Sequence, residues 1–159
     1  MPYYAMLNSF SFKDTEYIQI DGTVSPGPDL PLKIYGHTIL SINKTHSILI
    51  GGNSIDGYSN KTWFYNHSKK YWSPGPALMI ARDFHTAGII RDKQRNEETV
   101  VVVGGWSNGI TILDSVEVLN LKSGHTWTPG LFTVPMVFLK IRIQIIKRIF
   151  LKGQICQNH

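Results

Sequence analysis

Short apolar runs that each end in a pair of glycines are the clearest pattern of hydrophobic and polar positions in the chain. Residues 100–105 read Val-Val-Val-Val-Gly-Gly, and residues 47–52 read Ser-Ile-Leu-Ile-Gly-Gly. Such β-branched runs are poor helix formers, and four apolar residues are too few to cross a membrane. Each run is therefore predicted to be a buried strand. Each glycine pair is predicted to let the backbone turn or pass close to a neighbouring segment.

A second pattern, built on proline and glycine, recurs at a fixed distance from a histidine. Residues 24–30 read Val-Ser-Pro-Gly-Pro-Asp-Leu, residues 72–78 read Trp-Ser-Pro-Gly-Pro-Ala-Leu, and a third copy starts at Trp127. Proline fixes φ and the adjoining glycine permits a reversal, so each copy predicts a turn. His37 and His85 each follow the start of a copy by 13 residues and lead into an apolar stretch.

The chain therefore repeats, with a period of 48 residues from the first copy to the second and 55 from the second to the third. Most of the difference comes from the charged residues 91–98, which are predicted to form a lengthened hairpin loop. Both periods are close to the about 50 residues expected of a kelch blade. Residues 24–136 resemble kelch repeats.

The resemblance depends on order and spacing. In the kelch pattern an apolar strand precedes a glycine pair, a tyrosine with a following Asn or Asp comes next, and a tryptophan follows some six residues later. The first full copy supplies Gly51, Gly52, Tyr65, Asn66 and Trp72, and the second supplies Gly104, Gly105, Glu117, Asn120 and Trp127. Leu119 stands where the family has tyrosine, and Val24 where it has the first tryptophan.

The implied fold is all-β, an incomplete kelch β-propeller of four-stranded antiparallel blades in residues 1–136. The blades are expected at roughly 1–30, in part, then 31–78 and 79–136, with tryptophans filling the gap between adjacent sheets. A six-bladed ring would need about 300 residues. The 159 residues are thus expected to be a fragment of a propeller or a shortened product. Because two blades leave sheet edges exposed, self-association through those edges is a further expectation.

The last part of the chain, residues 137–159, departs from the repeat and is basic and apolar. Its five cations are Lys140, Arg142, Lys147, Arg148 and Lys152. They interrupt the apolar run, so no transmembrane segment is expected, and unrelated sequence appended to the repeat is favoured over attachment to a membrane or a nucleic acid. Without them the net charge of +5 disappears, leaving 11 basic and 11 acidic residues, and no nucleic-acid partner is expected.

Candidate catalytic chemistry is scarce. Cys156 is the only cysteine, which excludes an internal disulfide and a multi-cysteine metal site, and the six histidines lack metal-ligand spacing. His37 and His85 are interpreted as structural, and Asp83 beside His85 as packing in preference to a catalytic dyad. No nucleotide or nucleophile motif is present. The chain is predicted not to be an enzyme and to need no cofactor or metal.

The favoured function is a protein-protein interaction module whose binding residues lie on loops. The candidate loops follow the glycine pairs, and the candidate residues are Ile55, Asp56, Tyr58, Trp106 and Asn108. Tyr58 and Trp106 are the expected anchors, with blade packing as their alternative role.

The resemblance implies a fragment of a ubiquitin-ligase adaptor or of a cytoskeletal or extracellular binding protein. A fragment of a copper-oxidase-like propeller enzyme and a truncated product without independent function stay open as alternatives. Residues 1–20 lack a signal-peptide pattern, which favours the cytoplasm, whereas three N-glycosylation sequons at Asn43, Asn60 and Asn66 keep an extracellular location open.

Overall fold

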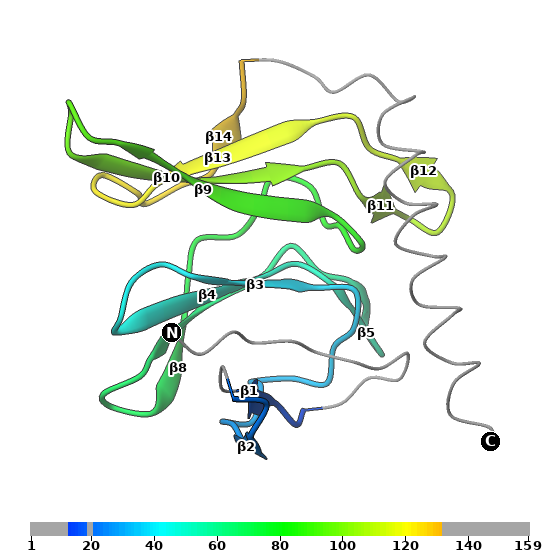
Figure 1. The fold of residues 1–159 in the computed structure, drawn as a ribbon. Coiled ribbons are helices and arrows are strands. Elements are labelled where there is room, and N and C mark those ends of the chain that lie inside the picture. The colour runs from blue at the N-terminus through cyan, green and yellow to red at the C-terminus, as the bar shows by residue number, and fades with distance from the viewer. Residues whose placement is uncertain (1–12, 19–20, 132–159) are drawn as a thin grey trace.

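Two four-stranded antiparallel sheets form the body of the molecule in the computed structural model, which describes residues 13–18 and 21–131. The described residues form strands and turns and no helix, as the all-β prediction requires. The first sheet contains β3 (Thr38–Ser41), β4 (His46–Ile50), β7 (Thr62–Asn66) and β8 (Tyr71–Pro74), in that order. The second contains β9 (Thr86–Asp92), β10 (Glu97–Val103), β13 (Val116–Asn120) and β14 (Thr128–Pro129), also in chain order. Figure 1 shows the two sheets stacked face to face.

Three two-stranded hairpins complete the described structure. They are β1 (Glu16–Ile18) with β2 (Val24–Pro26), β5 (Asn53–Ser54) with β6 (Gly57–Tyr58), and β11 (Trp106–Ser107) with β12 (Thr111–Ile112). The β1–β2 hairpin repeats the β7–β8 pairing of the first sheet. Thr15 Oγ1 donates to the carbonyl oxygen of Pro28 at 2.7 Å, and Thr62 Oγ1 donates to that of Pro76 at 2.7 Å. The hairpin therefore corresponds to the outer two strands of an earlier copy of the repeat.

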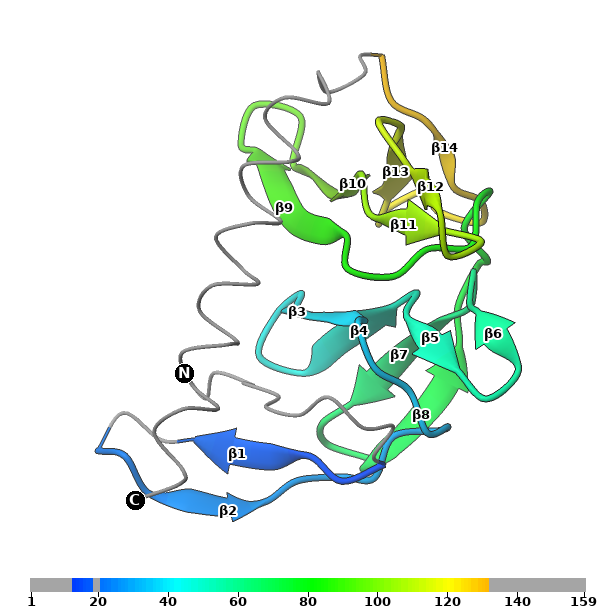
Figure 2. The same ribbon diagram turned by 90° about the vertical axis from the view of Figure 1, so that its right-hand side faces the viewer.

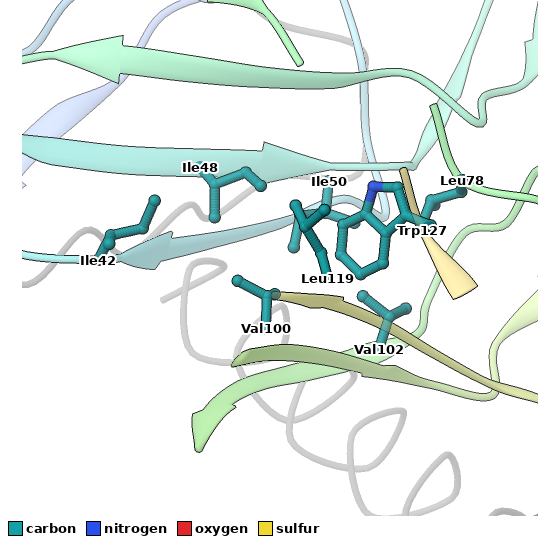
Figure 3. Packing of buried hydrophobic residues seen from close by; sticks show 8 residues of the cluster. All are labelled: Ile42, Ile48, Ile50, Leu78, Val100, Val102, Leu119 and Trp127. Carbon is teal, nitrogen blue, oxygen red and sulfur yellow. The ribbon is translucent and has the colours of Figure 1, made fainter. Parts of the chain in front are cut away.

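The main core lies between the two sheets. Its buried members are Ile42, Ile48, Ile50, Leu78, Val100, Val102, Leu119 and Trp127, which Figure 3 shows packed together. Trp127 is 4% exposed, and its Nε1 donates to the carbonyl oxygen of Pro76 at 2.9 Å, so one side chain joins the second sheet to the end of the first. This is the gap-filling position expected of the repeat's tryptophan.

The other face of the first sheet is covered as well. Leu49 packs there with Leu30 and Ile34, and Trp63 and Trp72 contact the same cluster. The indole Nε1 of Trp72 donates to the carbonyl oxygen of Asp29 at 2.8 Å, much as Trp127 bonds the segment before it. The first sheet is thus a buried layer with apolar contacts on both sides.

The outer face of the second sheet has no equivalent cover among the described residues. Counted from the glycine pairs, Val101 and Val103 occupy the positions of Ile48 and Ile50, which pack against the next sheet. Ile90, on the same face, is 60% exposed. This apolar face corresponds to the face of the first sheet that packs against the second sheet.

A buried ion pair fixes the segment between the sheets to the second sheet. Arg82 is fully buried, and its Nη2 donates to Oε1 of Glu117 at 2.5 Å while its Nη1 donates to the carbonyl oxygen of Gly104 at 2.7 Å. The Glu117 carboxylate also accepts the backbone N–H groups of Met79 and Ile80 at 2.6 and 3.1 Å. With these polar atoms satisfied, the pair avoids the penalty of an uncompensated buried charge.

The charged segment at 91–98 does not form a long loop, and that expectation was wrong. Strands β9 and β10 continue into it, pairing Arg91 with Glu98 and Asp92 with Glu97, so only residues 93–96 form the turn. Arg91 Nε donates to Glu98 Oε1 at 2.7 Å across the ladder. The opposite charges of Arg91 and Glu98 support the lengthened ladder, whereas Asp92 and Glu97 at its end are like charges that face one another.

Candidate functional site

The two hairpins that follow the glycine pairs, β5–β6 and β11–β12, lie at the same end of the stacked sheets (Figure 2). The glycines make this possible. Gly51 and Gly52 have φ of +56° and +102°, and a Cβ at Gly51 would lie 2.6 Å from the carbonyl oxygen of Arg82. Gly105 has φ of +98°, and its Cβ would lie 2.5 Å from the carbonyl oxygen of Asp83. Only glycine fits such positions without displacing the backbone between the sheets.

Backbone hydrogen bonds attach both hairpins to the segment that joins the sheets. Gly52 N donates to the carbonyl oxygen of Arg82 at 2.7 Å, beside β5. Asp83 and Trp106 exchange two hydrogen bonds of 3.0 and 2.9 Å, which hold β11. The segment therefore positions the two hairpins relative to one another.

The hairpins contact each other through Tyr58. Its hydroxyl oxygen lies 3.7 Å from the position that a Cβ would take at Gly109. Burial, followed by the charge of Asp83, raises the pKa of Tyr58. Tyr58 is half-buried, as is Trp106, whereas the tips of the hairpins are open to solvent. We define the hairpin surface as the exposed side of residues 53–58 and 106–112 with the adjoining Phe84.

The structure brings all five predicted partner-binding residues onto the hairpin surface. Asp56 and Asn108 are exposed and Ile55 is 96% exposed. Ile110, at the tip of the second hairpin, is 86% exposed. Ile55 and Ile110 are thus apolar side chains exposed at the tips of the two hairpins, and the role of these residues in binding stays a prediction.

Sequence reasoning missed the aromatic pair between the hairpins. The ring centroids of Tyr35 and Phe84 lie 6.3 Å apart, and Phe84 N donates to the carbonyl oxygen of Gly36 at 2.7 Å. Phe84 is 49% exposed and has φ of +48°, a left-handed conformation uncommon for an aromatic residue. The two residues lie 49 positions apart in the sequence, and no repeated signal marks them.

Buried titratable groups lie beneath this surface. Asp83 is 2% exposed, and burial raises its pKa to about 6 against the opposing effect of a hydrogen bond from Asn53. Burial lowers the pKa of His37 to about 4, and burial with the nearby Arg82 lowers that of His85 to about 3. Neither ring nitrogen of His85 has a hydrogen-bond partner within the described part of the chain, so Asp83 and His85 do not form a hydrogen-bonded dyad.

The described residues contain neither a cluster of metal ligands nor a membrane-spanning helix. Within 13–18 and 21–131, no three His, Cys, Asp or Glu side chains converge as a metal site. The same residues contain no helix long and apolar enough to span a bilayer. The tail at 137–159 lies outside the described residues.

At the opposite end of the sheets, a groove of about 430 Å³ separates the turn after β3 from the turns of the second sheet. His46 and Phe64 line one side, and Glu98, Leu121 and Lys122 line the other. Its mixed lining and wide opening present no convergent set of polar groups.

Comparisons with known proteins agree with the repeat. Residues 97–130 match the family model described as the Kelch motif, and these residues contain β10, the second glycine pair and Trp127. Kelch-like protein 41a of Danio rerio is 33% identical over 76 residues, which cover 48% of this chain and 12% of that relative's length. Residues 97–130 thus form a Kelch motif, and the antiparallel four-stranded sheets are consistent with kelch blades.

Proposed function

We propose that this chain is a non-enzymatic protein-interaction module that binds its partner through the hairpin surface. The observation that carries the proposal is the pair of exposed isoleucines, Ile55 and Ile110, at the tips of two hairpins held in contact with each other. The Kelch motif match and the kelch-like relative support it.

The two hairpins are held on a rigid scaffold. Both hairpins are bonded to the segment between two packed sheets, so little conformational entropy is lost when a partner binds them. Half-buried Tyr58 and Trp106 offer aromatic area in side chains with only two χ angles, which is typical of binding hot spots. The isoleucines supply apolar area that a partner would remove from water.

The larger assembly belongs to the same proposal. We expect blades at roughly 1–30, in part, then 31–78 and 79–136, within a propeller in which a further sheet covers the outer face of the second sheet. Where that cover is missing, we expect the chain to associate with itself through exposed Ile90 and the neighbouring valines. A role within a ubiquitin-ligase adaptor or a cytoskeletal or extracellular binding protein is the finer form of the proposal.

Quantitative affinity capture tests the proposed surface. The full chain is compared with the double variant Ile55→Asp/Ile110→Asp, and with Tyr71→Asp as control, because Tyr71 is 47% exposed on the strand end away from the hairpins. Partners captured by the wild type are expected to fall about 10-fold or more with the double variant and to persist with the control. The circular dichroism spectrum of the double variant shows whether it folds like the wild type. If it does and still captures the same partners in unchanged amounts, the proposal is refuted.

A further inference from the structure

The buried carboxylate of Asp83 lies between the two hairpins, and no cationic side chain of the described residues pairs with it. Asp83 is 2% exposed, its backbone pairs with Trp106 of one hairpin, and its side chain lies near Asn53 of the other. Among the residues that the structure describes, the Oδ1 atom of Asp83 has no hydrogen-bond partner. A buried carboxylate oxygen without a donor is costly, so its retention calls for an explanation.

The neighbouring charges do not supply the missing donor. Arg82, next in the chain, directs its guanidinium to Glu117, Ser115 and the carbonyl oxygen of Gly104. The hairpin residues 53–58 and 106–112 contain a single charged side chain, Asp56, and neither lysine nor arginine. No ion pair to Asp83 occurs among residues 13–18 and 21–131.

The surroundings of Asp83 are aromatic. Tyr58 lies close enough for the Asp83 charge to contribute to its raised pKa, after burial. Phe84, half exposed, is the next residue in the chain and packs against Tyr35. Aromatic faces attract cations, and most strongly the planar guanidinium group of arginine, which is also less strongly hydrated than a lysine ammonium group.

We propose that the hairpin surface accepts a partner segment in which an arginine stands between apolar residues. The guanidinium group donates to Oδ1 of Asp83 and lies against Tyr58 and Phe84, while the flanking apolar side chains contact Ile55 and Ile110. Because Oδ1 is covered in the free protein, Tyr58 or Phe84 changes rotamer on binding, as interface side chains commonly do. The inference names the chemistry of the partner and rests on the proposed function.

A matched pair of peptides tests it. The probes are acetyl-Leu-Arg-Leu-amide and the same peptide with citrulline, which has nearly the shape of arginine but no charge. Each is titrated into the ¹⁵N-labelled full chain and followed by NMR. The arginine peptide is expected to shift the amides of 53–58, 83–85 and 106–112 saturably and to bind about 10-fold or more tightly than the citrulline peptide.

Two variants make the result specific to Asp83. Asp83→Asn keeps the shape of the side chain and removes its charge, and is expected to bind the two peptides equally. Asp114→Asn removes an exposed carboxylate that lies outside the hairpin surface, and this variant is expected to keep a preference of at least about 5-fold for the arginine peptide.

Equal binding of both peptides to the wild type, or an unchanged preference in Asp83→Asn, would overturn the inference, as would the absence of any saturable shift. These outcomes are separable from failure of the proposed function. If Asp83→Asn captures the wild-type partners while Ile55→Asp/Ile110→Asp does not, the interaction surface stands and only its arginine specificity is wrong.

Discussion

Replacing Asp83 with asparagine is expected to stabilise the protein, because the folded state holds this carboxylate in a poor environment. Burial raises the pKa from 3.8 to about 6. A group whose pKa is higher in the folded state than in the unfolded state destabilises the fold as the pH rises through that interval, and the full penalty is present above about pH 6. A difference of about two pKa units corresponds to about 3 kcal/mol.

Part of this gain is offset in the variant. The new amide group lacks a defined acceptor and weakens the contact with Asn53, which costs about 1 kcal/mol. The net stabilisation expected for Asp83→Asn is therefore about 2 kcal/mol at pH 8. Below pH 4 the wild-type carboxylate is protonated in both states, so the advantage disappears.

Urea denaturation followed by tryptophan fluorescence at pH 8, 6 and 4 measures the effect. Asp56→Asn is the control, since an exposed carboxylate at a hairpin tip should change stability by less than about 0.5 kcal/mol at every pH. A variant that is less stable than the wild type at pH 8, or a difference independent of pH, contradicts the account of Asp83 as an unpaired buried charge.

Three further predictions concern the buried framework. Arg82→Ile, which leaves Glu117 charged and unpaired, should lower the free energy of unfolding by about 3–5 kcal/mol, and adding Glu117→Leu should recover most of it in the same urea titration. Gly105→Ala should lower the melting temperature more than Gly57→Ala, because both glycines have φ near +100° but only a Cβ at position 105 would collide with the backbone of Asp83. Equal shifts of the two melting temperatures in calorimetry would contradict this close approach. Because the pKa of His85 is lowered in the folded state, the unfolded state binds the proton first as the pH falls, and the stability of the wild type should decrease below about pH 6.5. The stability of His85→Gln should decrease less over the same range. Parallel pH profiles of the two proteins would show that His85 does not cause the decrease.

The repeat made much of the fold predictable from sequence. Two apolar runs ending in glycine pairs, with turns at matching distances, predicted an all-β protein of four-stranded antiparallel sheets, and that prediction is confirmed. It succeeded because strand pairing and chain reversal depend on local pattern, which each copy restates. Closure of the sheets into a ring stays a proposal.

Features that differ between the copies were less accessible. Arg82 and Glu117 form an ion pair in the second copy, and Ile34 and Trp63 occupy the corresponding positions in the first copy, where they make an apolar contact. Comparison of the two copies therefore did not reveal the ion pair. The same holds for Asp83, whose counterpart is Tyr35. Its surroundings come from hairpins 30 and 23 positions away in the sequence, and only the folded chain brings them together.

The most direct test of the central claim is site-specific photo-crosslinking of the full chain. A benzophenone amino acid is placed at position 55, at position 110 or, as control, at position 71, and the crosslinked proteins are identified by mass spectrometry. The account predicts that the same partner is crosslinked from positions 55 and 110 and not from position 71. A partner crosslinked from position 71 alone would contradict the assignment of binding to the hairpin surface.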